Sequence, residues 1–446
     1  MAYTEIYVDP SRQTRTACTI TNSTTTATVT LNSHGYSNSD TVKIQGANET
    51  AYNGNFVISN VTTNTFDYTM PSDPGGSATG SPLASKLNLS GVDGNSDANA
   101  YPDLQYALDT HSQNTANTNR FNIKAGVSEI LTKTISPANF GPGSVNYHTQ
   151  YEGYTSTAGD GGIATISGNN GNFTMYGVSS TNAYYADWKN LRLIDFGIGV
   201  VFGRYAYYGS AFNCEMSGSS CSAASNTPSA FSCIQCYIHN MSSTIATQNM
   251  SHSYCFVKHD ATSGACVDID NNMDVFNNNF ILAEGDTVRG ITVNNVDASR
   301  VYQNSILRIG TQSGQGIFLS RCYGGFIANN LIENFGNAFA IYNYTYGAGF
   351  YNNSYYNCTN GLSGAGDNQQ FNNTELLSES PFKKTGSLPT DFTSATFWDD
   401  VYAYFEPVGT GGVVNGGIGG KTRGATETSG AGGGLLRVGL GGGISG

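Results

Sequence analysis

A six-residue pattern of apolar and polar positions recurs along the middle of the chain. An apolar or aromatic residue, any residue, a polar residue and any residue precede two largely apolar residues, as in WKNLRL, FNNNFI and YNNSYY. The central positions lie 20 to 26 residues apart, and the match is loose at Cys255 and in FNNTEL. A near-constant period of this length is typical of solenoid turns that vary in their loops. The pattern predicts a right-handed parallel β-helix over residues 113–376.

The polar position of this repeat predicts a ladder of side chains. Successive coils of a β-solenoid stack about 4.8 Å apart, so equivalent amides can form hydrogen bonds from one coil to the next. The residues predicted to form this ladder are Asn190, Asn213, Gln235, Asn278, Asn304, Asn329, Asn353 and Asn373.

The N-terminal part has a different pattern of apolar and polar residues. Residues 1–13 contain a first strand, and residues 14–81 alternate apolar and polar positions in TATVTL, TVKI, NFVI and TFDYTM. Turn signals such as Asn53-Gly54 separate these stretches. This pattern predicts a small antiparallel β-module of five strands, inserted near the N-terminus and closed by PSDPGGSATGSP.

Residues 82–112 are predicted to be a linker followed by a capping helix. In YPDLQYAL, Pro102 is expected in the first turn, and Leu104, Ala107 and Leu108 form an apolar face at helical spacing. A short amphipathic helix ahead of many strands is suited to cover the open end of a solenoid.

The C-terminal part contains two further segments. Residues 377–408 are predicted to be a closing segment. Residues 409–446 form a Gly-rich tail in which 17 of 38 residues are glycine. Such a composition is typical of a flexible linker. We predict instead that this tail packs against neighbouring subunits.

Composition supports an all-β protein. Hydrophobic residues make up 39% of the chain and aromatic residues 12%, whereas charged residues make up only 12%. Strand-favouring Thr, Tyr, Phe, Val and Ile are common, and strong helix formers are scarce. The net charge of −12 argues against nucleic acid as a partner. No apolar run has membrane-spanning length, and no secretory signal is expected at MAYTEIYVDPSRQ.

The cysteines do not indicate a metal site. Their number, nine, is odd, and the CxxC of Cys233 and Cys236 has no second CxxC or His pair at metal spacing. In an extended strand these two side chains would point to opposite faces. We therefore expect the cysteines to act as small buried residues, and no cofactor is predicted.

Several stretches of the chain resemble two known families. HGYSNSDTVKIQGANETAYNGNFVISNVTTNTFDYTM resembles a small β-module of phage virion and tail-associated proteins. IYVDP, resumed by GVDGNSDANAYPDLQYAL, resembles the opening of pectate-lyase-like β-helix proteins, and SPFKKTGSLPTDF resembles their closing segment. The resemblance implies a parallel β-helix, commonly trimeric in phage spikes and fibres, that binds or cuts glycans. No catalytic signature of the family can be placed on this sequence.

Two acidic groups are candidates for chemistry. If the register holds, Asp260 and Glu284 lie on adjacent rungs, a spacing that could suit the carboxylate pair of a retaining glycosidase. Asp268 and Asp270, with Asp274 nearby, share one strand face and could bind a hard cation. The alternative is that these charges only solvate exposed turns.

Tyrosines offer a second kind of site. Tyr205, Tyr207 and Tyr208 cluster in one region, and Tyr351 and Tyr355 belong to another cluster. Tyrosine rings stack on sugars, but they also fill protein cores and subunit interfaces. The sequence leaves these alternatives open.

Together these features predict a bacteriophage virion protein, assembled in the host cytoplasm. It would be a capsid decoration, fibre or tail spike, working as a rigid projection or as an adhesin for host surface polysaccharide. The expected partners are copies of itself in a homotrimer and other virion proteins. The alternatives are a tailspike depolymerase, either a polysaccharide lyase or a glycoside hydrolase, and a bacterial surface protein that binds polysaccharide.

Overall fold

The computed structural model describes residues 3–408 with internal gaps, and the predicted packing of the Gly-rich tail lies outside the described residues. The chain forms two compact units, residues 1–232 and 233–446, which are described in turn. The gaps are 112–118, 136–148, 170, 173–174, 177–185, 197–199, 204–207, 219–220, 224–229, 242–244, 249–250, 261, 271–275, 286, 297–299, 343–344, 365–369 and 373.

The chain is mostly β and forms the predicted parallel β-solenoid, with about 24 residues per turn. Each full turn contributes one strand to each of three parallel sheets, called I, II and III in the order in which the chain enters them. In the first unit, sheet I contains β1 (Thr4–Val8), β9 (Asn119–Lys124), β11 (Thr149–Tyr154), β14 (Ala186–Lys189) and β17 (Tyr208–Phe212). Sheet II contains β10 (Glu129–Ile130), β12 (Ala164–Ser167), β15 (Leu191–Phe196) and β18 (Glu215–Gly218). Sheet III contains β13 (Met175–Tyr176), β16 (Val200–Gly203) and β19 (Cys221–Ala223).

The small antiparallel module interrupts the chain between β1 and the helix α1. After the module, the chain returns to β1, where Val8 pairs with Tyr101 and the Asp9 N–H donates to the Tyr101 carbonyl at 2.8 Å. The two halves of the interrupted opening segment are therefore neighbours in the fold. Three short 3-10 helices lie in this part of the chain. They are η1 (Pro10–Arg12) after β1, η2 (Thr50–Tyr52) inside the module and η3 (Asp97–Asn99) before α1.

The module consists of two antiparallel sheets around a core that includes Val29, Ile44, Phe66 and Tyr68. Its strand β8 lies partly in the stretch that the sequence suggested was linker, because the backbone of β8 pairs with β5 along most of its length. The module thus extends to Lys86, beyond the expected boundary at residue 81. One sheet has the order β2 (Thr16–Ala17), β8 (Gly80–Lys86), β5 (Thr41–Ala47) and β6 (Gly54–Val57); the other has the order β3 (Thr19–Ser23), β4 (Thr26–Thr30) and β7 (Thr65–Thr69).

The helix α1 (Leu104–Thr110) begins three residues later than the pattern suggested. Asp103 is its N-cap, and the Asp103 carboxylate accepts a hydrogen bond from the Tyr106 N–H at 2.7 Å. Pro102 therefore precedes the helix instead of lying in its first turn. Leu104, Ala107 and Leu108 are buried, as their spacing predicted.

A buried ion triad links the module to the start of the solenoid. Lys43 of β5 lies 2.6 Å from a carboxylate oxygen of Asp103 and 2.6 Å from one of Glu129, the first residue of β10. The three side chains are at most 1% exposed. Burial raises the pKa of Glu129 to about 7, although the nearby Lys43 opposes this shift. Two carboxylates face one ammonium group here, so the triad favours a proton on Glu129.

This arrangement predicts that stability falls as pH rises. The folded state holds a proton on Glu129 up to a pKa of about 7, whereas the unfolded chain releases it near 4.5. Because the folded state binds more protons between these values, the free energy of unfolding decreases across this range. We expect urea unfolding of the wild type to lose roughly 3 kcal/mol from this source between pH 4.5 and 8. In Glu129→Gln this loss should disappear, and parallel pH profiles for the two proteins would contradict the prediction.

The second unit continues with the same three-sheet order. Sheet I contains β20 (Ala230–Ile234), which spans the division between the units, β23 (Ser251–Ser253), β26 (Phe276–Asn277), β29 (Arg300–Tyr302), β32 (Phe326–Ala328), β35 (Gly349–Tyr351) and β38 (Gln370–Asn372). Sheet II contains β21 (Tyr237–Met241), β24 (Phe256–His259), β27 (Phe280–Ala283), β30 (Ser305–Arg308), β33 (Leu331–Glu333), β36 (Ser354–Tyr356) and β39 (Glu375–Leu376). Sheet III contains β22 (Ile245–Gln248), β25 (Ser263–Asp270), β28 (Thr287–Asn294), β31 (Ser313–Ser320), β34 (Phe335–Tyr342) and β37 (Asn360–Ser363).

One residue with a left-handed backbone makes the corner between sheets I and II in eight turns. Its φ lies between 50° and 57°, a conformation that asparagine tolerates better than most residues. These corner residues are Asn190, Asn213, Gln235, Tyr254, Asn278, Gln303, Asn329 and Asn352. Five of the predicted ladder residues are therefore corner residues, and among them the Asn213 amide still donates to the Asn190 side chain at 2.8 Å.

The next position in each turn points inward and forms the buried ladder. In four successive turns it is Asn279, Asn304, Asn330 and Asn353, all 0% exposed. The first three amides each donate to the side-chain oxygen of the following asparagine at 3.0 Å, and the Asn353 amide donates to the Ile327 carbonyl at 2.9 Å. The predicted ladder residues thus belong to two adjacent columns. Five of them form the corner column, whereas Asn304 and Asn353 belong to the inward column. Asn373 lies outside the described residues.

Cysteine occupies the same inward position in three earlier turns, as Cys214, Cys236 and Cys255. Each thiol donates to the carbonyl two residues before it, at 3.4 to 3.5 Å. Cys233 and Cys236 both face the interior, because the corner at Gln235 lies between them. The expectation that they point to opposite faces was therefore wrong.

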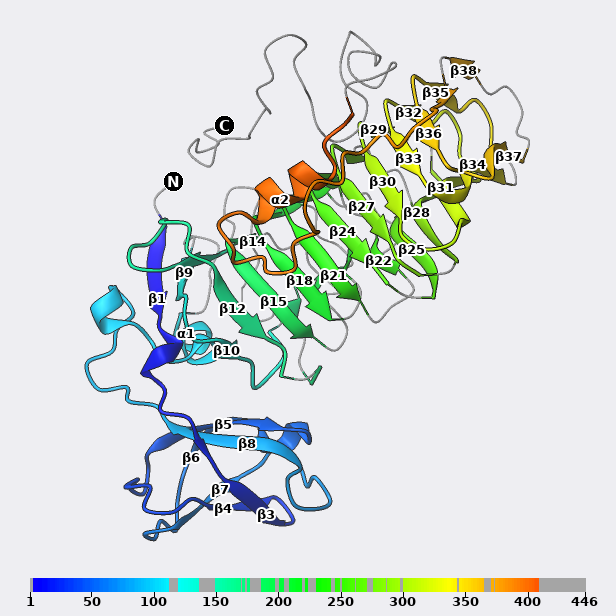
Figure 1. The fold of residues 1–446 in the computed structure, drawn as a ribbon. Helices are drawn as coiled ribbons and strands as arrows, with labels where there is room; N and C mark the ends of the chain where they lie inside the picture. Colours follow the sequence, from blue (N-terminus) through cyan, green and yellow to red (C-terminus); the bar gives the residue numbers. More distant parts are fainter. Residues whose placement is uncertain are drawn as a thin grey trace. The chain divides into compact units, whose positions relative to one another are not determined.

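The closing segment runs back along the solenoid and forms the helix α2 (Phe397–Tyr404), which the sequence did not predict (Figure 1). Its aromatic residues pack on the outer face of sheet II, with ring centroids 4.8 Å apart for Tyr237 and Phe397 and 5.2 Å apart for Phe280 and Phe405. This part of sheet II is therefore covered. Within the described parts of the chain, no helix is both long and apolar enough to span a membrane.

Candidate functional site

The two carboxylates proposed for glycoside chemistry do lie in adjacent turns. Asp260 and Glu284 directly follow His259 and Ala283, which pair between β24 and β27. Asp260 is exposed, and Glu284 forms an ion pair with Lys258 at 3.2 Å. This geometry places both groups in contact with water, and one of them already has a cationic partner. It does not provide the enclosed, apolar surroundings that keep a catalytic acid protonated.

The acidic group on β25 is only partly described. Asp268 lies on the outer face of the strand, between the buried Val267 and Ile269. The side chain of Asp270 and all of Asp274 lie outside the description. Among the side chains that are described, no group of three or more His, Cys, Asp or Glu residues could hold a metal ion.

The predicted glycan-binding tyrosines separate into different environments. Tyr205 and Tyr207 lie outside the described residues, as does the side chain of Tyr208. Tyr355 pairs with Ile332 of the preceding turn, whose side chain is 0% exposed, so Tyr355 continues a column of core residues. Tyr351 is half-buried on the outer side of sheet I and belongs to the feature described next.

Six aromatic residues form a surface strip where the chain passes from sheet III to sheet I. The rings stack in pairs between neighbouring turns, with centroids 5.4 to 6.3 Å apart and interplanar angles of 15° to 28°. Three of the rings are 37% to 58% exposed, unusually high values for large apolar side chains. The pairs of this aromatic strip are Phe318–Tyr342, Tyr323–Tyr346 and Phe326–Tyr351.

The sequence contained a signal for this strip. The partners in the three pairs are 24, 23 and 25 residues apart, which is the period of the solenoid. The six-residue repeat is centred on the polar corner of each turn and does not extend to Phe318, Tyr323 and Phe326. A search for aromatic residues one turn apart would have found them.

Polar side chains flank the aromatic strip on the outer face of sheet III. The Arg289 guanidinium lies 3.9 Å from the centroid of the Phe318 ring and donates to Gln315 at 2.8 Å. In the following turns, Asn360 donates to Asn337 at 3.0 Å, and Gln315, Asn337 and Asn360 occupy paired positions of β31, β34 and β37. Aromatic faces beside amide and guanidinium donors can stack on sugar rings and form hydrogen bonds with their hydroxyls.

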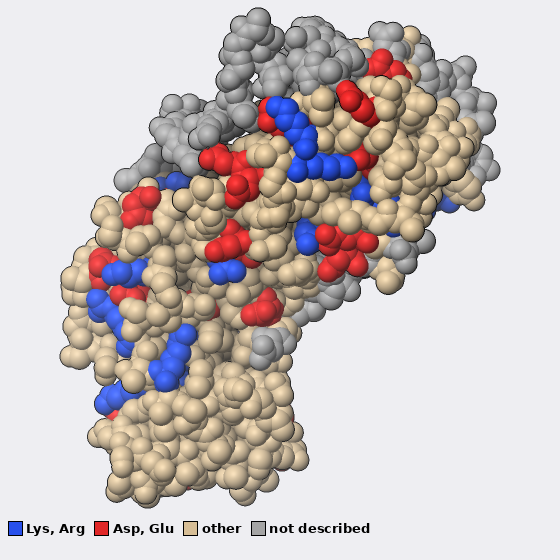
Figure 2. Space-filling model, in the orientation of Figure 1, with Lys and Arg blue, Asp and Glu red and all other residues tan. Residues whose placement is uncertain are grey.

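Figure 2 shows charged side chains over the solenoid strands, many of them as red and blue neighbours, and almost none on the visible face of the module. Several of the solenoid neighbours are ion pairs, such as Lys384 with Glu333 at 2.5 Å. Many of the charges on this visible face are thus paired locally, and paired charges of this kind contribute little to binding. No protein-family model, curated protein or solved structure matches this chain.

Proposed function

We propose that this protein is a non-enzymatic structural component of a bacteriophage particle, a capsid decoration, fibre or spike, that contacts host surface polysaccharide. The observation that carries the glycan contact is the aromatic strip, with its exposed stacked rings and adjacent hydrogen-bonding side chains. The phage origin rests on the resemblance of the N-terminal module and of the two β-helix end segments. By the same resemblance, the protein would assemble as a homotrimer with other virion proteins.

The position of the strip supports this role over a purely structural one. Aromatic residues on sheet II are covered by α2, so their apolar surface is removed from water. No described residue covers Tyr323 and Tyr342 to that extent, and they remain 51% and 58% exposed. Exposed aromatic surface of this kind marks interaction sites in many proteins. Stacking on sugar rings would use it without requiring a deep cleft.

A depolymerase is the second candidate, because Asp260 and Glu284 occupy adjacent turns. In that case Asp260→Asn or Glu284→Gln should abolish cleavage of the host polysaccharide, with assembly unchanged. Polysaccharide of unchanged length after incubation with the wild type would exclude this candidate.

The test of the proposal measures binding of the full chain to an array of bacterial surface oligosaccharides. We expect Tyr323→Ser/Tyr346→Ser to weaken binding by about tenfold or more, because a stack loses both its rings. The matched control is Leu362→Ser/Leu376→Ser, which removes exposed apolar side chains from the last turns without removing a ring, and it should bind like the wild type. Equal loss in both variants would contradict stacking. Unchanged binding with loss of the oligomer would make the strip a subunit interface instead.

A further inference from the structure

The N-terminal module contains a surface groove that the proposed function does not use. One hollow of about 400 Å³ is bordered by the loop after β4 and by the end of β8. A second hollow of about 300 Å³ also borders Leu31 and Asn32 and is lined by Cys18, and the two neighbouring hollows are together called the groove. Such a volume falls within the range of small-molecule sites, roughly 300–1,000 Å³.

A braced loop forms one wall of this groove. Ser33 has a left-handed backbone with φ of 51°, and such strain in a serine persists only where the surroundings enforce it, whereas Gly35 adopts its φ of 67° freely. The Ser33 N–H donates to the Asn64 side chain at 3.0 Å, and the Tyr36 N–H donates to His34 Nδ1 at 3.0 Å. The His34 ring also packs against Phe66, with centroids 5.3 Å apart. The loop is therefore held in place before any ligand arrives.

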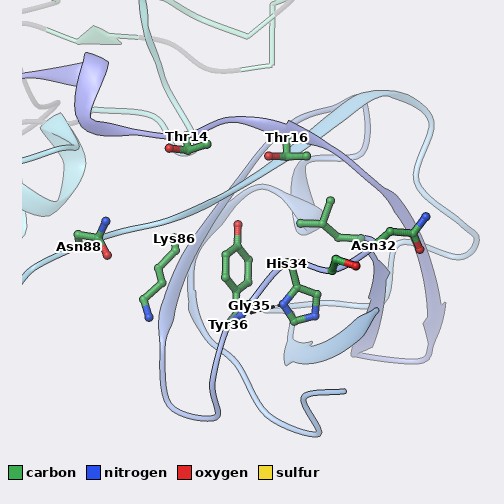
Figure 3. Close-up of a pocket in the computed structure, with 10 residues that line it drawn as sticks. Thr14, Thr16, Asn32, His34, Gly35, Tyr36, Lys86 and Asn88 are labelled. Atoms are coloured by element: carbon green, nitrogen blue, oxygen red, sulfur yellow. Dashed lines mark hydrogen bonds between the residues drawn. The ribbon is translucent and has the colours of Figure 1, made fainter. Parts of the chain in front are cut away.

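Figure 3 shows how the side chains of the groove lie. Tyr36 stands between His34 and Lys86, and its hydroxyl points toward Thr14 and Thr16. The other polar groups that border this hollow come from Asn32, Ser33 and Asn88. The groove thus combines the rings of Tyr36 and His34 with hydroxyl and amide groups that both donate and accept hydrogen bonds.

The scarcity of charged side chains around the two hollows limits the class of ligand that they could bind. Lys86 is the one charged residue among those that border the two hollows, and its ammonium group already pairs with Asp40 at 2.7 Å. Among the described residues, no carboxylate borders either hollow. A ligand without charge, rich in hydroxyls and with a flat apolar face, fits this environment better than an acidic glycan or a basic peptide.

From these contacts we infer that the module carries a second carbohydrate site, a groove that binds a short neutral oligosaccharide with one sugar ring on Tyr36. Thr14, Thr16 and Asn32 provide hydrogen bonds to its hydroxyls. The site is separate from the aromatic strip and does not depend on it. With two sites on one chain, binding to a repeating polysaccharide would gain from multivalency, and further in an oligomer.

The experiment uses isothermal titration of the full chain with three neutral probes: maltohexaose, cellohexaose and mannohexaose. We expect at least one of them to bind with a Kd between about 10 μM and 1 mM. Tyr36→Ala should weaken this binding about tenfold or more, and Asn32→Ala severalfold. Asn32 is exposed, so its replacement tests the groove without disturbing the core. Val57→Ala, at an exposed apolar position of the same module, is the matched control and should bind like the wild type.

Two outcomes would overturn the inference: no binding of any of the three probes, or unchanged binding in both Tyr36→Ala and Asn32→Ala. Tyr323→Ser/Tyr346→Ser separates the two sites. This variant should keep full binding of the probes, because it leaves the groove intact. If it loses the probes while Tyr36→Ala keeps them, the groove proposal fails and the proposed role of the aromatic strip stands.

Discussion

Replacing Lys43 with methionine should lower the free energy of unfolding of the N-terminal unit by roughly 3–5 kcal/mol. The substitution leaves the Asp103 carboxylate and the Glu129 carboxyl group buried without the ammonium group that lies 2.6 Å from each. Water cannot replace it readily, because the three side chains are almost completely buried. The loss should be visible as faster hydrogen exchange in peptides from β5, α1 and β10, and as a lower urea midpoint.

Lys86 provides a matched control on the neighbouring strand β8. Its ammonium group lies 2.7 Å from Asp40, nearly the distance found in the triad, but its side chain is 35% exposed. Exposed pairs contribute little, so Lys86→Met should cost less than about 1 kcal/mol. The deficit of Lys43→Met should also shrink at acidic pH, where the two carboxyls take up protons. Equal effects of the two substitutions at pH 7 would show that the triad does not stabilise the junction.

The triad also shows what an alternating pattern cannot predict. In TVKI the alternation places Lys43 opposite the buried Val42 and Ile44, on the face where a lysine is normally solvated. In the structure both faces of β5 are buried. The partners of Lys43 lie 60 and 86 residues further along the chain, and no local pattern indicates that they meet there.

The solenoid could be predicted because its signal repeats. The period of the polar positions corresponds to one turn, and the parallel sheets follow from it. The register within a turn was harder, because asparagine is favoured at the corner for its backbone and in the interior for its amide. Pairs such as Asn278-Asn279 and Asn329-Asn330 satisfy both needs at adjacent positions. A one-residue shift between these columns leaves the pattern unchanged, so the sequence alone could not separate them.

The candidate sites were predicted less well, for a related reason. The aromatic strip shares the period of the solenoid and could have been found, whereas the groove depends on the folding of one loop. His34 acts through its ring nitrogen and its packing on Phe66, and neither contact has a sequence signature. The helix α2 was missed because most of its apolar residues are aromatic, and aromatic residues have low helix propensity. Its packing on sheet II stabilises it instead.

Replacing Asn304 with alanine should destabilise the second unit by roughly 2–4 kcal/mol, because it leaves buried donors without an acceptor. The Asn304 side-chain oxygen accepts hydrogen bonds from both the backbone N–H and the amide of Asn279, at 3.1 and 3.0 Å. Asn360→Ala is the matched control. The Asn360 amide also forms a hydrogen bond with an asparagine of a neighbouring turn, but it is exposed. This substitution should therefore lower the free energy of unfolding by less than about 0.5 kcal/mol. Urea unfolding, followed by hydrogen exchange in peptides spanning residues 276–333, measures both variants. If Asn304→Ala is as stable as Asn360→Ala, the inward ladder does not hold the turns together, and packing of the apolar columns alone must do so.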